Sequence, residues 1–176
     1  MLLAPLVRRS LAPAGCTPVL KQKTTHRERV SLVAGLAISP VRQKLSLHFR
    51  TYPKGYVNAP QTIEFLRQLL RHLRGPVIVV WDGGMMHRGA RVREFELRHP
   101  RLELHRLPPY APDLNPVEAI WNHLKYHRFA NYVPPDIWTL DARVKKHLCK
   151  LQTDQAKLQT FFTAADLPIL KVQRLK

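Results

Sequence analysis

The segment from Leu107 to Lys125 constrains the fold more than any other part of this 176-residue chain. Its first half contains four prolines, each of which fixes φ and removes a backbone donor, so this half cannot form a regular helix or strand. Asn115 and Pro116 then supply a good N-cap and a favoured first helical residue. The apolar residues that follow at helical spacing are Val117, Ile120, Trp121 and Leu124. The segment therefore predicts an irregular loop leading into a helix that lies on a core.

Glu118 has two interpretations at the start of this predicted helix. An Asn cap with Glu three residues later is close to a capping box, which only satisfies backbone N–H groups. A role in chemistry needs a second carboxylate, and Asp82 directly follows the apolar run Val77–Trp81. Such a run is typical of a strand buried on both faces. Asp82 would then lie at the carboxyl edge of a sheet, where ligands bind in open α/β sheets.

Asp82, His87 and the Leu107–Lys125 segment together resemble the catalytic domain of bacterial insertion-sequence transposases, in the mariner-like DDE superfamily. The resemblance extends from about Leu3 to about Val133. It implies an α/β, ribonuclease H-like fold, with a mixed sheet flanked by helices. It also implies DNA transposition by metal-dependent DNA strand cleavage and strand transfer. By motif, Asp82 and Glu118 are the second and third catalytic carboxylates, 118 − 82 = 36 positions apart, and would hold Mg²⁺ or Mn²⁺.

The chain departs from the family pattern in two places. Gly83 and Gly84 follow Asp82, where the family usually has Asn. The first catalytic Asp is expected upstream of Leu3, whereas the sequence begins at Met1. We therefore expect the first strand of the fold to be missing or incomplete and the chain, truncated at its N-terminus, to be poorly active alone. The alternative function is that of a non-catalytic DNA-binding remnant of a transposase.

The charge of the chain points to a polyanionic partner. Lys and Arg number 29 against 12 Asp and Glu, a formal net charge of +17, as is typical of nucleic-acid-binding proteins and of some membrane-surface proteins. The resemblance favours DNA, as transposon ends and target. It leaves open a homodimer or an upstream-frame product that supplies the missing Asp and a DNA-recognition domain. His87 and Lys125 are candidate DNA contacts, each weighed against a plain capping or solvent-exposed role.

No apolar run is long enough to span a membrane, and we expect no membrane partner. Cys16 and Cys149 are too few for a disulfide framework or a zinc site, so a reducing, cytoplasmic compartment is expected. Asp113 could be taken for a further ligand, but Pro-Asp before Leu-Asn is ordinary turn chemistry.

The remaining patterns predict the order of elements. Alternating apolar residues in 30–38 and 44–50 predict an antiparallel hairpin. Asn58 and Gln61 flank Pro60 at a helix start, and apolar residues at helical spacing from Ile63 to Leu73 predict a helix that Gly75-Pro76 ends. A strand over 77–81, a short helix over 90–98, a strand over 102–107 and the helix from Pro116 follow. We assign residues 1–133 to a partial catalytic domain and 134–176 to a C-terminal helical extension packed on it. The basic helix of this extension is interpreted as covering the sheet rather than reading DNA.

Overall fold

The fold was analysed in a computed structural model that describes residues 4, 6–21, 28–84 and 89–165. The predicted order of hairpin, helix, strand, helix, strand and helix is confirmed. The elements are β1 (Val30–Ile38), β2 (Leu45–Pro53), α1 (Ala59–His72), β3 (Val77–Trp81), α2 (Ala90–Leu97), β4 (Leu102–Arg106), a 3₁₀ turn η2 (Pro112–Leu114), α3 (Pro116–Asn122), a π-helical turn η3 (His123–Arg128), α4 (Ile137–Thr153) and α5 (Gln155–Thr163). None of the described helices is both long and apolar enough to cross a membrane.

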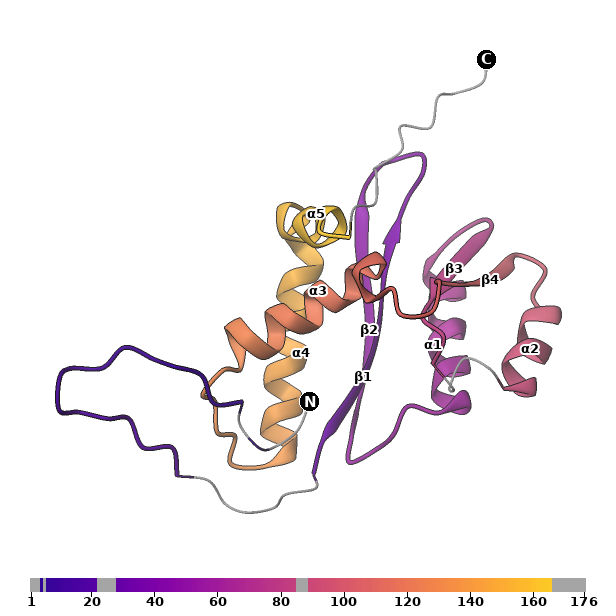
Figure 1. Ribbon diagram of the computed structural model, residues 1–176. Coiled ribbons are helices and arrows are strands. Elements are labelled where there is room, and N and C mark those ends of the chain that lie inside the picture. The colour runs from indigo at the N-terminus through magenta and orange to yellow at the C-terminus, as the bar shows by residue number, and fades with distance from the viewer. Residues whose placement is uncertain (1–3, 5, 22–27, 85–88, 166–176) are drawn as a thin grey trace.

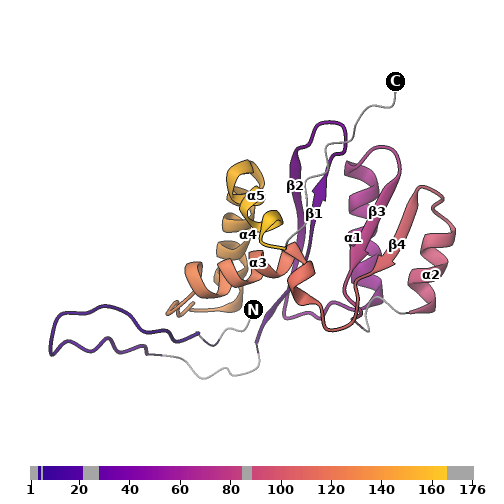
Figure 2. The same cartoon turned by 45° about the horizontal axis from the view of Figure 1, so that its top comes forward.

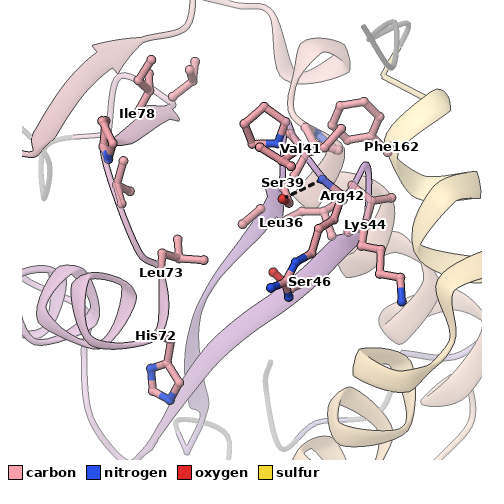
Figure 3. Close-up of a pocket in the computed structure, with 18 of the residues that line it drawn as sticks. Leu36, Ser39, Val41, Arg42, Lys44, Ser46, His72, Leu73, Ile78 and Phe162 are labelled. Atoms are coloured by element: carbon pink, nitrogen blue, oxygen red, sulfur yellow. Dashed lines mark hydrogen bonds between the residues drawn. The ribbon is translucent and has the colours of Figure 1, made fainter. Parts of the chain in front are cut away.

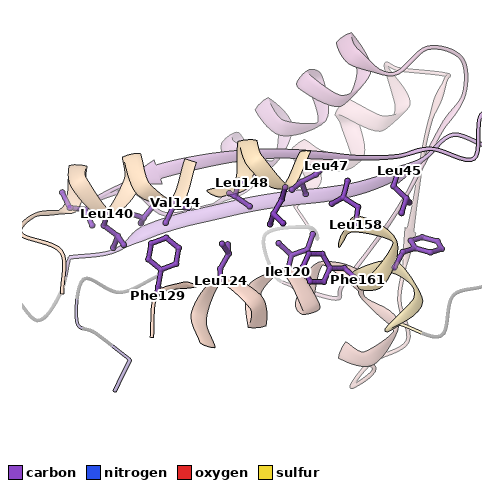
Figure 4. Packing of buried hydrophobic residues seen from close by; sticks show 14 residues of the cluster. Leu45, Leu47, Ile120, Leu124, Phe129, Leu140, Val144, Leu148, Leu158 and Phe161 are labelled. Carbon is purple, nitrogen blue, oxygen red and sulfur yellow. The ribbon is translucent and has the colours of Figure 1, made fainter. Parts of the chain in front are cut away.

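The β1–β2 hairpin forms the first layer of the structure. The two strands pair antiparallel along their whole length, from Val30 opposite Pro53 to Ile38 opposite Leu45. Helices α3, α4 and α5 lie on one side of this hairpin (Figure 1). Their apolar side chains meet those of β2 in the larger core, where Ile120 and Leu124 point towards Val144 and Leu148 (Figure 4). The predicted stripe of the Pro116 helix therefore packs on a core, as expected.

The second layer contains the parallel pair β3–β4, with Val77 opposite Leu102. Helices α1 and α2 cover one face of this pair and share a separate core with it, built around Phe65, Leu66 and Phe95. This layer lies on the other side of the hairpin from α4 and α5, as both views show (Figures 1 and 2). The described residues thus form two cores, one on each side of the β1–β2 hairpin.

The sheets differ from the sequence expectation in two respects. Instead of one mixed sheet, the described strands form two separate two-stranded sheets, β1–β2 and β3–β4. The prediction that the Val77–Trp81 strand is buried on both faces is wrong, because Ile78 and Val80 are 64% and 56% exposed. Val77 and Val79 pack on the α1 and α2 side. In a strand whose side chains are apolar on both faces, the sequence does not indicate which face other elements cover.

The C-terminal extension contains two described helices, α4 and α5, where the sequence indicated only one basic helix. The side chain of Asp154 accepts a hydrogen bond from the Lys157 N–H (2.9 Å), which ends α4 and caps α5. Gln155 then extends the edge of β2, since its side chain accepts from the Leu45 N–H (3.2 Å) and donates to the Leu45 carbonyl (2.8 Å). The Gln155 side chain thus satisfies the backbone N–H and carbonyl of Leu45 at the edge of β2, and these two hydrogen bonds help to place the turn between α4 and α5.

Candidate active site

Asp82 is the first residue after β3, at the carboxyl end of that strand, and its side chain is exposed. Its Oδ1 accepts a hydrogen bond from the Gly84 N–H at 3.0 Å. This contact orients the carboxylate relative to the turn that leaves the strand. The Gly83-Gly84 departure from the family pattern therefore lies directly beside the carboxylate, and a backbone N–H of this pair positions it.

Glu118 lies in the first turn of α3 and is half-buried. The Asn115 side chain caps the helix by accepting from the Val117 N–H (3.1 Å), while the Asn115 N–H donates to the Pro112 carbonyl (2.9 Å). Because Pro112 satisfies this N–H, the capping box proposed for Glu118 does not form. The Glu118 carboxylate has no hydrogen bond or ion pair with any described residue. It remains available to a ligand.

The start of α1 shows what a reciprocal cap looks like in this protein. There, Gln61 stands three residues after Asn58, and its Oε1 accepts from the Asn58 N–H at 3.1 Å. An Asn cap followed three residues later by Gln or Glu therefore forms a capping contact in α1, whereas in α3 the Glu118 carboxylate makes no such hydrogen bond. The difference lies in the chain before the cap, where the proline-rich loop brings the Pro112 carbonyl to the Asn115 N–H.

Asp82 and Glu118 line the same cavity, which has a volume of about 300 Å³. Asn115 and Trp121 also line it, and apolar residues of β1, α1 and β3 form the remaining wall. The topology brings the two carboxylates together because the loop after β4 returns the chain across the carboxyl end of β3 and places the start of α3 there (Figure 1). Their role as metal ligands stays a prediction.

A larger cavity of about 1040 Å³ continues this space between the two sheets. Both cavities are lined by Leu36, Ala37, Val77, Ile78 and Val80, from the facing parts of β1 and β3. Figure 3 shows Ile78 and Leu73 on one side and Leu36, Ser39 and Val41 on the other. We call the two cavities together the inter-sheet cleft. The sequence did not predict it, because an apolar strand residue does not reveal whether another strand lies beside it.

The comparisons with known proteins support the family resemblance. The family model described as DDE superfamily endonuclease matches residues 2–141. This chain belongs to that family. A search of curated proteins found no match.

Solved structures show the same fold for this chain. The Mos1 mariner paired end complex with Mn is 15% identical over 93% of this chain and 48% of that chain, with a TM-score of 0.62. The Mos1 transposase paired-end complex with left transposon end is 17% identical over 92% and 47%, also with 0.62. The Mos1 strand transfer complex is 19% identical over 92% and 46%, with 0.59. The chain spans about half the length of these proteins, and the predicted α/β, ribonuclease H-like fold is confirmed.

The donor set at this cavity fits a hard divalent cation. Mg²⁺ prefers oxygen ligands and is commonly held by one or two carboxylates, with waters and substrate phosphates completing its shell. Asp82 and Glu118 supply two carboxylates at one cavity, which suits a single ion. Among the described residues no group of three His, Cys, Asp or Glu is placed to hold a metal. A pair of ions would therefore need a further carboxylate.

The other candidate residues lie away from this pair or are not described. His87 falls in 85–88, outside the described residues. Lys125 is exposed on η3 and does not line the cavity that holds Asp82 and Glu118. Asp113 is exposed in η2 and does not line it either. The structure therefore brings together two of the predicted site residues and separates Lys125 from them.

His123, the first residue of η3 directly after α3, has an ionisation that the fold changes strongly. Burial and the positive charges of Lys157 and Arg128 lower the pKa of His123 from 6.5 to about 4. The Arg128 Nε donates to the His123 Nε2 at 3.3 Å, which a neutral ring can accept. The α3–η3 segment thus keeps a neutral imidazole at neutral pH within a group of cations.

We expect this histidine to make folding stability depend on pH. Between pH 6.5 and about 4 the unfolded chain binds a proton at His123 that the folded chain does not, so stability falls as the pH falls through this window. His123→Gln should reduce this acid-side loss, because glutamine does not titrate. Urea midpoints measured across the window test it. Identical pH profiles for the two proteins would show that His123 does not contribute.

Proposed function

We propose that this chain is the catalytic domain of a metal-dependent DNA transposase that cleaves strands at transposon ends and joins them to target DNA. The observation that carries the proposal is that Asp82 and Glu118 line one cavity at the carboxyl end of β3, inside the segment that matches the DDE endonuclease family. Mos1 structures of similar fold are a paired end complex with Mn and a strand transfer complex. They support the choice of divalent metal and DNA for this chain.

In this proposal Asp82 and Glu118 hold Mg²⁺ or Mn²⁺. When bound, such an ion activates water and stabilises the leaving oxygen in phosphodiester cleavage. The protein's own contribution is positioning. The Asn115 cap and Pro116 fix the first turn of α3, from which Glu118 projects, and the Gly84 N–H orients Asp82. Trp121 and apolar residues of β1, α1 and β3 form the wall of the cavity beside the two carboxylates.

We further propose that an added β-strand in the inter-sheet cleft supplies the third carboxylate. Among the described strands, β1 pairs only with β2 and β3 pairs only with β4, and their facing residues line the cleft. A strand there could hydrogen-bond to both sheets and cover the exposed side chains of Ile78 and Val80. An upstream-frame product carrying an Asp is the source we propose. A homodimer remains the other partner that the resemblance leaves open.

This part of the proposal is tested by supplying the proposed additional strand. Supercoiled plasmid nicking in Mg²⁺ or Mn²⁺ is compared for the 176-residue chain alone and for the chain supplemented with the polypeptide encoded directly upstream. We expect weak or no nicking by the chain alone and metal-dependent nicking by the pair. The same segment with its Asp changed to Asn is the matched control and should not restore activity. Full-rate nicking by the chain alone would contradict the need for a third carboxylate.

The second candidate function is a non-catalytic DNA-binding remnant. It is favoured by the lack of a three-residue metal-binding group among the described residues and by the net charge of +17. If neither the chain nor the supplemented pair nicks DNA, while both bind it, this function replaces the first. In either case we propose a cytoplasmic location, which the two free, exposed cysteines Cys16 and Cys149 favour.

A further inference from the structure

A strongly basic surface lies at the far end of the helical segment that carries Glu118 in its first turn. It is formed by η3, α4 and α5 and contains cationic side chains together with histidines. We call it the basic–histidine surface, and its members are Arg128, Arg143, Lys146, Lys150, Lys157, His123, His127 and His147. The sequence indicates the basic helix that forms α4, which we interpreted as covering the sheet. It does not indicate the rest of the surface, because the members are spread over 35 positions (157 − 123 + 1 = 35) and meet only through packing of three helices.

The charges of this surface face one another across the three elements. The pKa of His147 on α4 is lowered by burial and by the charges of Arg128, Arg143, Lys146 and Lys150. The ring of His123 stacks with that of His127 (centroids 5.7 Å apart) and tilts against Phe161 of α5 (5.4 Å). On α4, Arg143, His147 and Lys150 are spaced at i, i+4 and i+7, which places them on one side of the helix. The surface is therefore continuous across η3, α4 and α5.

The carboxylates of these helices do not neutralise the surface. Asp136 and Asp154 cap the starts of α4 and α5, where they accept from the N–H groups of Thr139 (2.7 Å) and Lys157 (2.9 Å). Asp141 is buried and pairs with Lys145 at 2.7 Å. Among the described residues, none of the five cations of the surface forms an ion pair with a carboxylate. A bound polyanion would supply the missing counter-charge.

Two of the cations are held in place by aromatic rings. The guanidinium of Arg143 lies 4.0 Å from the ring centroid of Tyr132, and the Lys157 ammonium lies 5.5 Å from that of Phe161. Such contacts order a long side chain before a ligand arrives. Arg128 is ordered by its hydrogen bond to His123. The planar guanidinium groups of Arg128 and Arg143 match the geometry of phosphate oxygens.

We propose that the basic–histidine surface binds the phosphate backbone of duplex DNA, as a second contact region separate from the carboxylates. The proposal rests on the proposed function, which makes DNA the polyanion in question. Helix α3 continues into η3 at His123 without leaving helical geometry. Glu118 and Arg128 are ten residues apart in this segment (128 − 118 = 10), which corresponds to roughly 15 Å along its axis at a rise of 1.5 Å per residue. One duplex can therefore contact both ends of the segment.

The test is DNA binding without metal by the full chain and by the variant Arg143→Gln/Lys146→Gln/Lys150→Gln. These three side chains are exposed on α4, so folding should be unaffected, as circular dichroism and urea midpoints will check. The matched control removes the same charge elsewhere through Arg71→Gln/Arg91→Gln/Arg93→Gln, on α1 and α2. We expect the α4 variant to lose affinity on the order of 100-fold near 0.15 M salt and about three units of salt slope. The control should lose much less.

Each outcome decides a separate point. Equal losses of DNA affinity in the two triple variants would overturn the proposed binding surface. They would show that affinity depends only on the net charge of the chain. Tighter binding of the full chain to an RNA duplex or to anionic vesicles, with the same loss in the α4 variant, would overturn the assignment to DNA. Normal DNA binding by the α4 variant, together with metal-dependent nicking by the supplemented wild-type chain, would overturn this inference and leave the proposed function intact. No nicking by the supplemented wild-type chain, together with weaker DNA binding by the α4 variant than by the control, would overturn the proposed function and leave this inference intact.

Discussion

Replacing Glu118 with glutamine is expected to abolish metal-dependent DNA cleavage by the supplemented chain while leaving DNA affinity nearly unchanged. Glutamine keeps the size of the side chain and loses the charge that a divalent ion requires. The Glu118 carboxylate has no described partner, so the substitution breaks no hydrogen bond and should not lower stability. Metal-assisted stabilisation is worth several kcal/mol of the barrier, and a loss of about 4 kcal/mol lowers the rate roughly 1000-fold.

The natural control for Glu118→Gln is Asp113→Asn. Asp113 lies in the same proline-rich segment and is a carboxylate, but it is exposed in η2 and does not line the cavity with Asp82. Nicking rates and filter-binding constants are measured for both variants at several metal concentrations. We expect Asp113→Asn to behave like the wild type in both assays. An Asp113→Asn defect as large as that of Glu118→Gln would move the metal site to η2 and sink the present assignment.

Local sequence patterns were sufficient to predict the elements and their order. The alternation in β1 and β2, the Gly75-Pro76 end after α1 and the Asn115-Pro116 start of α3 depend on residues within one turn or one strand. Asp82 and Glu118 line one cavity because the loop after β4 crosses the carboxyl end of β3 before α3 begins. The elements and their order needed no knowledge of which surfaces pack together, whereas this meeting of the two carboxylates did.

Long-range packing decided the features that the sequence did not predict. The run Val77–Trp81 is apolar on both faces, yet α1 and α2 cover only one. Between Leu151 and Phe161 the chain divides into two helices at Asp154. The position of this break depends on the hydrogen bonds of the Gln155 side chain with Leu45 at the edge of β2. His147 joins His123 and Arg128 only because α4 packs against η3. In each case the deciding partner is distant in the chain or lies on another face.

Replacing Leu148 with alanine is expected to cause the largest loss of stability among single substitutions in α4. Leu148 is 0% exposed and packs in the core that α4 shares with β2, α3 and α5. Removing a buried leucine side chain costs about 2–5 kcal/mol, because apolar contacts are lost and a cavity remains. Folded domains are stable by only about 5–15 kcal/mol in total. The substitution should therefore remove a large part of the folding stability of the whole chain. This includes α3, which carries Glu118 and packs in the same core.

The matched control is Leu97→Ala on α2, because Leu97 is 79% exposed and truncating it should change the free energy of unfolding by less than about 0.5 kcal/mol. Urea unfolding followed by far-ultraviolet circular dichroism and by tryptophan fluorescence compares both variants with the wild type. Helices α4 and α5 hydrogen-bond to β2 through Gln152 and Gln155, so we expect one transition that both probes report together. If Leu148→Ala instead produced a separate early transition, residues 134–176 would fold as an independent unit. In that case α4 would not stabilise α3, the helix that positions Glu118.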